Sequence, residues 1–266
     1  MTVITSLQNP RVRAAVQLRD RKHRQRQERI TIDGTRELAR ALDGGVQLVE
    51  IFVCDSLCRD DETQQLRARL PASGAEIFDV SPAVFEKLAF GKRAEGVLGV
   101  ASPPSVRLAE IVLGENPLVG VLEGVEKPGN LGAVLRTADG AGLSAVVAAD
   151  ARTDLYNPNA IRASLGTIFT LPVAAASAPE TLAWLSDKNL AIYAARVDGA
   201  VPYTEVDFRR PSAIVLGSEA EGLTGIWGDP QVTAIRIPMR GAADSLNVSA
   251  TAAVLFYEAL RQRGIC

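Results

Sequence analysis

Short and almost entirely apolar runs constrain the fold of this chain more than any other feature of its sequence. The clearest are Pro117–Val125, Ser144–Ala149 and Ser212–Leu216. Strands that are buried on both faces of a parallel sheet have this composition, because helices cover both faces of such sheets. The runs alternate with segments of helical periodicity, such as Asn130–Ala141, which is typical of α/β domains. We therefore predict a parallel sheet with helical connections in this half of the chain.

The first hundred residues show the same alternation of short strands and helices, which predicts a second, smaller α/β domain. Ser102-Pro103-Pro104-Ser105 then interrupts both kinds of element and is the best linker candidate. The predicted domains are 1–101 and 115–266, joined by a linker over 102–114. The remaining predicted strands are Arg29–Asp33, Val46–Cys54, Ala75–Val80, Val97–Ala101, Ala191–Val197 and Val232–Ile237, and the remaining predicted helices are Gly34–Asp43, Pro82–Phe90, Pro158–Gly166 and Ser245–Arg263.

Charge is distributed unevenly along the chain. The net charge is −2, but the first 29 residues contain eight basic and two acidic side chains, so they carry +6 and the remainder −8. Seven of the eight basic residues are arginines, whose planar guanidinium suits phosphate groups. The run is either a nucleic-acid-facing arm or helix, or a solvated helix face. The candidate RNA-binding residues are Arg21, Lys22, Arg24 and Arg26.

Composition also excludes several classes of protein. The sequence has neither a signal-peptide pattern nor an apolar stretch of the roughly 18 residues that a membrane helix needs, so the expected compartment is the cytoplasm. Three cysteines and one histidine cannot supply a disulfide framework. Cys54 and Cys58 lack a second ligand pair, so we predict no metal centre. Because no apolar stretch is long enough to cross a membrane, we also predict no membrane partner.

Three segments place polar side chains at the carboxyl ends of predicted strands, where active sites of open α/β sheets gather. The first two also have simpler interpretations, a helix cap with a surface arginine and a tight strand-to-helix turn, and the third opens the last helix. The chemical candidates are Asn130 and Arg136 in the first segment, Gly217 and Glu219 in the second, and Ser245, Asn247 and Ser249 in the third.

Taken together, the three segments resemble the SpoU/TrmH family of RNA ribose 2′-O-methyltransferases. Asn130 and Arg136 match the family pattern N-x5-R, Leu216–Glu219 match LGSE, and Ile237–Ser249 match IPM-x-G-x3-SLNVS. The resemblance covers residues 115–266. The head resembles the N-terminal substrate-binding domain of the family more loosely, through Ile4–Pro10 and Ile32–Gly34.

The resemblance implies a parallel-sheet SPOUT domain with a deep trefoil knot, together with a smaller N-terminal α/β domain that binds RNA. It also implies a homodimer with its sites at the subunit interface, where Ala250–Ala253 would pack. The implied cofactor is S-adenosylmethionine, held largely by backbone groups. The matching cofactor positions are Leu216, Gly217, Ile237, Met239, Ser245 and Leu246.

The implied reaction is attack of a ribose 2′-hydroxyl on the sulfonium methyl group. Arg136 matches the arginine proposed to position RNA and to stabilise the developing alkoxide, while Asn130, Glu219, Ser245 and Asn247 would orient Arg136 or the ribose. The N-terminal domain favours 23S rRNA as substrate, including the antibiotic-resistance subset of such enzymes. The alternatives are a tRNA methyltransferase and a non-catalytic RNA-binding or ribosome-assembly protein.

Overall fold

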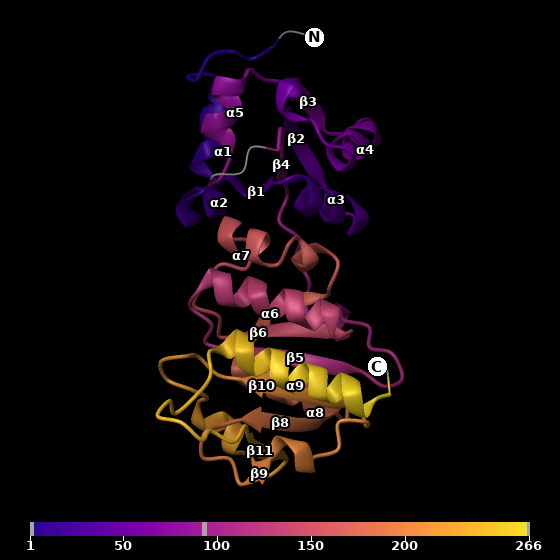
Figure 1. Cartoon of the computed structure of the whole chain (residues 1–266), viewed down its shortest axis with the longest axis vertical. Helices are drawn as coiled ribbons and strands as arrows, with labels where there is room; N and C mark the ends of the chain where they lie inside the picture. The colour runs from indigo at the N-terminus through magenta and orange to yellow at the C-terminus, as the bar shows by residue number, and fades with distance from the viewer. Residues whose placement is uncertain (1–2, 92–94, 265–266) are drawn as a thin grey trace. The chain divides into compact units, whose positions relative to one another are not determined.

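The computed structural model describes residues 3–91 and 95–264, which form two compact units. The first unit comprises the chain up to Pro104 together with Asp154–Thr170, and the second comprises Ser105–Thr153 and the chain from Leu171 onward (Figure 1). The predicted boundary near the double proline therefore lies close to the structural one. The prediction differs from the structure at Asp154–Thr170, which we had placed in the second domain.

The first unit is built on a four-stranded sheet with the order β1-β4-β2-β3. β4 is antiparallel to both of its neighbours, whereas β2 and β3 are parallel. Phe52, Phe85 and Leu98 form part of its core. The strands are β1 (Ile30–Asp33), β2 (Leu48–Val53), β3 (Glu76–Asp79) and β4 (Val97–Ala101), and the helices are α1 (Pro10–Gln17), α2 (Arg21–Gln27), α3 (Thr35–Asp43), α4 (Asp61–Arg69), α5 (Pro82–Leu88) and α7 (Pro158–Ala163).

Residues Asp154–Thr170 join the first unit because their apolar and polar groups both find partners there. The α7 residues Pro158 and Ile161 are buried. Arg40 Nη1 on α3 donates a hydrogen bond to the carbonyl of Leu165 at 2.7 Å. Gly166 has φ 83° and lies so close to the α3 backbone that a Cβ atom would clash with it. These contacts are long-range, which is why sequence order alone assigned the segment to the wrong domain.

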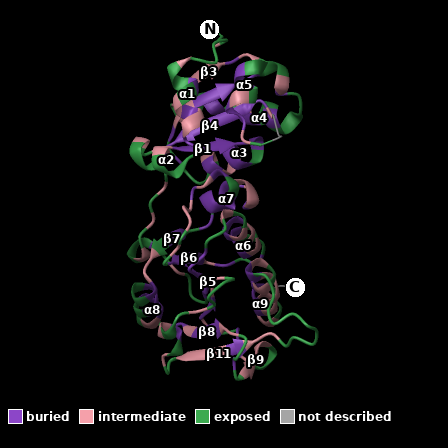
Figure 2. Ribbon diagram, turned by 90° about the vertical axis from the view of Figure 1, so that its left-hand side faces the viewer, coloured by how far each residue is buried: buried purple, intermediate pink, exposed green. Residues whose placement is uncertain are grey.

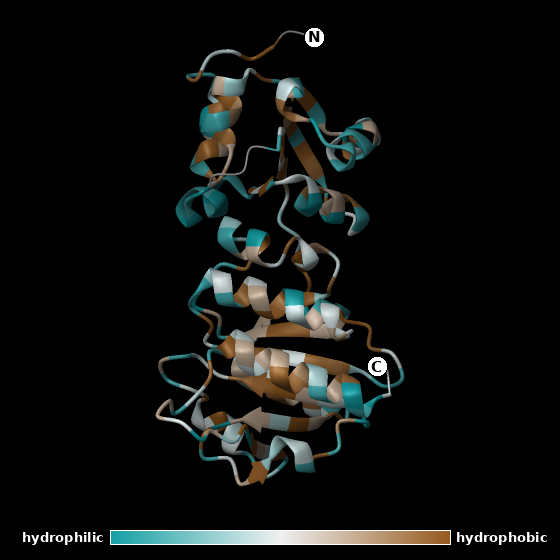
Figure 3. Ribbon diagram, in the orientation of Figure 1, coloured by the Kyte–Doolittle hydropathy of each residue, from teal (hydrophilic) through white to brown (hydrophobic). Residues whose placement is uncertain are grey.

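The second unit contains a seven-stranded parallel sheet with the order β7-β6-β5-β10-β8-β11-β9. Figure 2 shows α6 and α9 on one face and α8 on the other, and Figure 3 shows that apolar residues dominate the strands. The strands are β5 (Leu118–Glu123), β6 (Ala145–Ala149), β7 (Val173–Ala176), β8 (Ala191–Ala195), β9 (Val201–Pro202), β10 (Ser212–Leu216) and β11 (Val232–Arg236), and the helices are α6 (Pro128–Gly140), α8 (Ala178–Asp187) and α9 (Val248–Gln262).

The strand order brings four chain segments to one edge of this sheet. β10 lies between β5 and β8, with Leu216 opposite Leu122 on one side and Ala195 on the other. β8 in turn pairs with β11. Because all of these strands are parallel, the segments that follow β5, β8, β10 and β11 meet at the same carboxyl edge.

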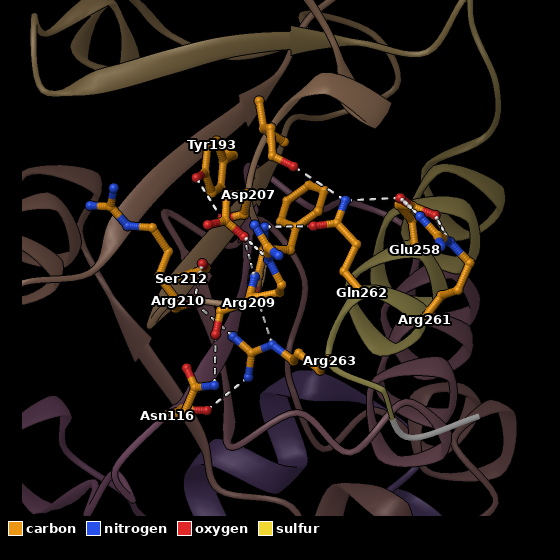
Figure 4. Close-up of polar contacts among 12 residues, drawn as sticks. Asn116, Tyr193, Asp207, Arg209, Arg210, Ser212, Glu258, Arg261, Gln262 and Arg263 are labelled. Carbon is orange, nitrogen blue, oxygen red and sulfur yellow. Dashed lines mark hydrogen bonds and ion pairs between the residues drawn. The ribbon is translucent and has the colours of Figure 1, made fainter.

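A partly buried arginine anchors the carboxyl end of α9 at the opposite edge of the sheet (Figure 4). Arg263 donates hydrogen bonds to the carbonyls of Phe208 (2.9 Å), Asn116 (2.7 Å), Pro117 (3.1 Å) and Arg210 (3.0 Å). Asn116 and Pro117 precede β5, and Arg210 precedes β10. With its last turn held where these strands begin, α9 has its first turn at the edge where they end. None of the described helices is long and apolar enough to cross a membrane.

Candidate active site

Glu219, in the loop after β10, joins three segments at the carboxyl edge of the sheet. Its Oε1 accepts hydrogen bonds from Asn130 Nδ2 at 2.8 Å and from Asn247 Nδ2, and its Oε2 pairs with Lys127 Nζ. The hydrogen-bonded Lys127 ammonium lowers the pKa of Glu219, and Asn130 acts in the same direction. Three predicted site residues, Asn130, Glu219 and Asn247, thus form one hydrogen-bonded cluster, which also contains Lys127.

The two asparagines belong to helix starts, but in different ways. Asn247 is the N-cap of α9, and its Oδ1 accepts a hydrogen bond from Ser249 N at 2.9 Å. For Asn130 the prediction of a cap was wrong. Lys127 is the N-cap of α6, and Pro128 is its first residue, where a missing N–H costs nothing. Asn130 lies within the first turn, which leaves its side chain available to Glu219.

The loop Ser218–Gly222 is a tight turn that carries Glu219. Ser218 and Gly222 exchange two backbone hydrogen bonds of 3.1 Å. A Cβ atom at Gly217 would clash with the backbone of Gly222, so glycine is required there by the protein itself. A second carboxylate of the loop, Glu221, pairs with Arg152, whose Nη1 also donates to Glu126 Oε1 at 2.7 Å.

A buried carboxylate supports the far side of this loop. Glu123, the last residue of β5, is 3% exposed. Its two oxygens accept hydrogen bonds from Thr224 N (2.8 Å) and Thr224 Oγ1 (2.6 Å). A carboxylate buried in this way is stabilised by its donors. Glu123 therefore ties the segment after the turn to the end of β5.

An open cleft of about 490 Å³ lies beside the turn, at the carboxyl ends of β8, β10 and β11. Its size is in the range of small-molecule sites. Its charged lining residues are four carboxylates, Asp198, Glu219, Glu221 and Asp244, and one guanidinium, Arg196. The structure brings all six predicted cofactor residues to this cleft, namely Leu216, Gly217, Ile237, Met239, Ser245 and Leu246.

A smaller cavity of about 200 Å³ lies on the other side of the same loop. Lys127 and Asn130 line it, and Gly217, Ser218 and Glu219 line both this cavity and the cleft. The start of this turn therefore borders both the larger cleft and the smaller cavity. One predicted catalytic residue, Ser245, lines the cleft and has no hydrogen bond to the Glu219 cluster.

Arg136 is not brought to this cluster within the described residues of the chain. It is an exposed residue of α6, six positions after Asn130, which corresponds to about 9 Å along a helix. It lines neither cavity, and its guanidinium has no hydrogen bond or ion pair with another described residue. The guanidinium is thus free to bind a group from outside this chain.

The basic side chains of the first 29 residues fall into two groups, those with a structural role and those exposed to solvent. Arg24 is 4% exposed, and its Nε donates to Asp154 Oδ2 at 2.6 Å while its Nη1 donates to the carbonyls of Leu18 and Arg19 at 2.7 Å. Two of its three nitrogens are therefore hydrogen-bonded inside the first unit, and its role as an RNA-binding residue stays a prediction. Arg21, Lys22 and Arg26 are exposed on α2, and Arg26 also contacts His23 at 3.2 Å.

Sequence reasoning did not single out Lys127, Arg152 or the support role of Glu123. Glu123 and Lys127 both lie inside the first motif segment. The signal available for Lys127 was its place directly before the proline that starts the helix. Arg152 follows β6 outside every motif, and only the parallel order of β6, β5 and β10 brings it to Glu221.

Comparison with known proteins agrees with this arrangement. Residues 117–257 match the SpoU rRNA Methylase family. The chain belongs to this family. Residues 9–99 match the MRM3-like substrate binding domain, which covers most of the first unit. The chain is therefore a SpoU methylase with an N-terminal substrate-binding domain, as the resemblance of its motifs implied.

Relatives and solved structures extend over nearly the whole chain. The 23S rRNA (guanosine-2'-O-)-methyltransferase RlmB of Bordetella pertussis is 33% identical over 231 residues, which cover 85% of this chain and 94% of the relative. A crystal structure of an RNA 2'-O ribose methyltransferase is 43% identical with a TM-score of 0.86, over 98% of this chain and 99% of that one. An AdoMet-bound rRNA methyltransferase from Sinorhizobium meliloti is 27% identical with a TM-score of 0.88, over 98% and 97%.

Proposed function

We propose that this protein transfers the methyl group of S-adenosylmethionine to a ribose 2′-hydroxyl in structured RNA, with 23S rRNA as the substrate. The proposal rests on the position of the segment Gly217–Glu219, which borders both the cleft and the smaller cavity. The six family cofactor positions line the cleft, Asn130 and Lys127 line the smaller cavity, and Gly217 and Glu219 line both. The Bordetella pertussis relative, a 23S rRNA methyltransferase by name, supports the choice of RNA.

The cleft fits S-adenosylmethionine in size and charge. Three of its four carboxylates are in ion pairs, Glu219 with Lys127, Glu221 with Arg152 and Asp198 with Arg196. The fourth, Asp244, is the lining carboxylate that would attract a ligand with sulfonium and ammonium charges. Gly217, Ile237 and Leu246 would contribute backbone groups, and Met239 would contribute apolar surface. When bound, the cofactor would supply an electrophilic methyl group. The AdoMet-bound Sinorhizobium meliloti structure supports this assignment.

The residues of the chain would bind, orient and stabilise the attacking ribose. Glu219 holds Asn130 and Asn247 in fixed orientations, which prepares the smaller cavity for a ribose and reduces the ordering required in the reaction. Lys127 at the rim would contact a phosphate of the RNA. Arg136 would bind RNA and stabilise the alkoxide that develops at the 2′-oxygen. An arginine is always protonated, so it serves as an electrostatic group and not as a base.

Three further features belong to the proposal. The catalytic unit forms the trefoil knot of SPOUT proteins, with the cofactor held at the knot. Two copies form a homodimer, with α9 and Ala250–Ala253 at the interface, and the dimer acts in the cytoplasm. The partly exposed small residues of this stretch support close packing of helices, and exposed Tyr257 lies on the same helix. Sedimentation at several concentrations tests the dimer directly.

Replacement of Arg136 by alanine tests the catalytic assignment. We expect Arg136→Ala to lower the rate of methyl transfer by about a hundredfold or more, since it removes a preorganised charge. Cofactor affinity, measured by calorimetry, stays within about twofold because Arg136 does not line the cleft. Arg107→Ala is the matched control, since Arg107 is also exposed but lies before β5. Full activity in Arg136→Ala would contradict the assignment.

Labelled methyl transfer into separated rRNA and tRNA pools tests the function itself. We expect label in rRNA, with a primer-extension stop at one ribose under low nucleotide concentration. Label confined to tRNA would identify a tRNA methyltransferase instead. Binding of RNA with no transfer to either pool would support a non-catalytic RNA-binding or ribosome-assembly protein.

A further inference from the structure

The loop between β11 and α9 carries a carboxylate that no described side chain neutralises. Asp244 is exposed and lines the cleft beside Ser245 and Leu246. Within residues 3–91 and 95–264, its side chain has no hydrogen bond or ion pair. Asp244 occupies one of the variable positions of the pattern IPM-x-G-x3-SLNVS, so the motif assigns it no role.

The other three carboxylates of the cleft have cationic partners. The pairs are Asp198–Arg196, Glu219–Lys127 and Glu221–Arg152. Arg240 belongs to the same loop as Asp244, but it does not line the cleft and forms no ion pair with Asp244. The described lining therefore has one uncompensated negative charge, that of Asp244, and its potential favours a cation.

Asp244 lies close in the chain to the border between the cleft and the smaller cavity. Asn247, three residues later, donates a hydrogen bond to Glu219 Oε1, and Glu219 lines both sites. Three residues span at most about 11 Å, even in a fully extended chain. Methyl transfer requires reacting atoms about 3 to 3.5 Å apart, so the sulfur of the cofactor belongs at this border. Asp244 thus belongs to the end of the cleft at which the positive charge of that sulfur is required.

We propose that Asp244 makes the cleft sensitive to the charge on the cofactor sulfur and so distinguishes S-adenosylmethionine from S-adenosylhomocysteine. In the transfer, the bond from the ribose oxygen to the methyl carbon forms and the bond from sulfur to that carbon breaks. The electron pair of the broken bond stays on sulfur, and the hydroxyl proton passes to solvent water. The sulfur thereby loses its positive charge, and with it the attraction to Asp244.

The consequence is a cleft that favours the methyl donor and releases the spent cofactor. This inference rests on the proposed function and adds to it a specificity-determining residue outside the family motifs. The ammonium and carboxylate groups are common to both ligands, so a comparison of the two ligands isolates the charge on sulfur.

Calorimetric titration of Asp244→Asn with three ligands tests the proposal. The measured quantity is the dissociation constant of S-adenosylhomocysteine divided by that of S-adenosylmethionine. We expect the variant to lower this ratio about fivefold, with the affinity for S-adenosylhomocysteine changed by less than about twofold. Sinefungin, which has a protonated amine in place of the sulfonium, should lose affinity as S-adenosylmethionine does. Asp244→Glu keeps the charge and should keep most of the ratio.

Asp187→Asn is the matched control, because Asp187 is exposed at the end of α8 and does not line the cleft. A variant that merely disturbs the loop would weaken all three ligands equally and leave the ratio unchanged. An unchanged ratio in Asp244→Asn, or an equal fall in Asp187→Asn, overturns the inference while the proposed function stands. A wild-type protein that binds none of the three ligands would refute the proposed function and this inference with it.

Discussion

At the scale of residues, arginines close together in sequence have different physical roles. Arg19 Nη2 donates to the carbonyls of Lys87 (2.7 Å) and Ala89 (2.8 Å) at the end of α5. Arg24 forms a buried ion pair, and Arg21, three positions earlier, is exposed. The total charge of the head therefore overestimates the charge that a nucleic acid would meet. Burial and hydrogen bonding decide which cations remain available.

Removal of the Arg24 side chain should lower the stability of the protein, whereas removal of the Arg21 side chain should not. We expect Arg24→Ala to lower the free energy of unfolding by about 3 kcal/mol, because Asp154 and two carbonyls lose their buried donor. Arg21→Ala should leave it unchanged within about 0.5 kcal/mol, since the side chain is at the surface. Urea denaturation followed by circular dichroism measures both. Equal stability of the two variants would contradict the structural role of Arg24.

The buried carboxyl of Asp33 should make the first unit sensitive to pH. Burial raises its pKa to about 6, against the favourable hydrogen bond from Phe90 N at 2.6 Å and the positive charge of Arg162. Glu95 and Glu37 also raise this pKa. Because the folded state binds this proton more tightly than the unfolded state, Asp33 lowers stability as pH rises from about 4 to 6, and the loss persists above pH 6.

Asp33→Asn should therefore flatten the pH dependence of stability. Asparagine keeps an acceptor for Phe90 N but does not ionise. Between pH 4 and pH 7 the free energy of unfolding should fall less in the variant than in the wild type, by up to about 3 kcal/mol. Urea denaturation at several pH values measures this difference. The exposed Glu86→Gln is the control and should follow the wild type. A pH profile of Asp33→Asn identical to that of the wild type would contradict the assignment.

At the scale of elements, the Ser218–Gly222 turn is held from two sides. Glu219 joins it to the starts of α6 and α9, and Glu221 joins it to Arg152 after β6. The turn therefore couples segments that follow three parallel strands. Its backbone forms part of the cleft wall, so its orientation affects cofactor binding as well as the ribose side.

Arg152→Ala should loosen this turn. Both ion pairs of Arg152 are solvent-exposed, so their loss is modest, and we expect a weakening of S-adenosylmethionine binding of roughly twofold to fivefold. Arg152→Lys should restore part of the affinity. Arg209→Ala removes a comparably exposed pair with Asp207 at the other edge of the sheet and serves as the control. Calorimetric affinities of Arg152→Ala equal to those of Arg209→Ala would exclude the coupling.

At the scale of the whole molecule, the chain forms two units but crosses between them more than once. The first unit takes Asp154–Thr170 from the middle of the second half of the sequence, and each unit has its own sheet and core. The catalytic cleft is lined entirely by residues of the second unit.

Cofactor binding should consequently stabilise one unit selectively. We expect S-adenosylmethionine to slow amide hydrogen exchange in residues 216–223 and 237–248, two segments that contain most of the cleft-lining residues. Exchange in β1, β2 and β4 should not change. The measurement is hydrogen exchange with mass spectrometry, with and without the cofactor. Protection of comparable size in the first-unit strands would place the binding site elsewhere.

The sequence alone predicted most of the strands, because uninterrupted apolar runs are specific for strands buried in a parallel sheet. It did not predict β7 or α8. The short Val-Ala-Ala-Ala run of β7 has little hydrophobic contrast, and its pairing with β6 supplies what local propensity does not. Linear motifs also indicated Asn130, Glu219 and Asn247 without showing that they hydrogen-bond to one another.

Local pattern and motif determined the α/β class, the family and the polar residues at strand ends, because each depends on residues that are close in sequence. Tertiary structure alone decided which residues meet. It placed Lys127 and two asparagines on Glu219, moved Asp154–Thr170 into the first unit, and buried Arg24 against Asp154. These outcomes depend on strand order and long-range packing, which bring together groups such as Arg24 and Asp154 that are 130 positions apart in the chain.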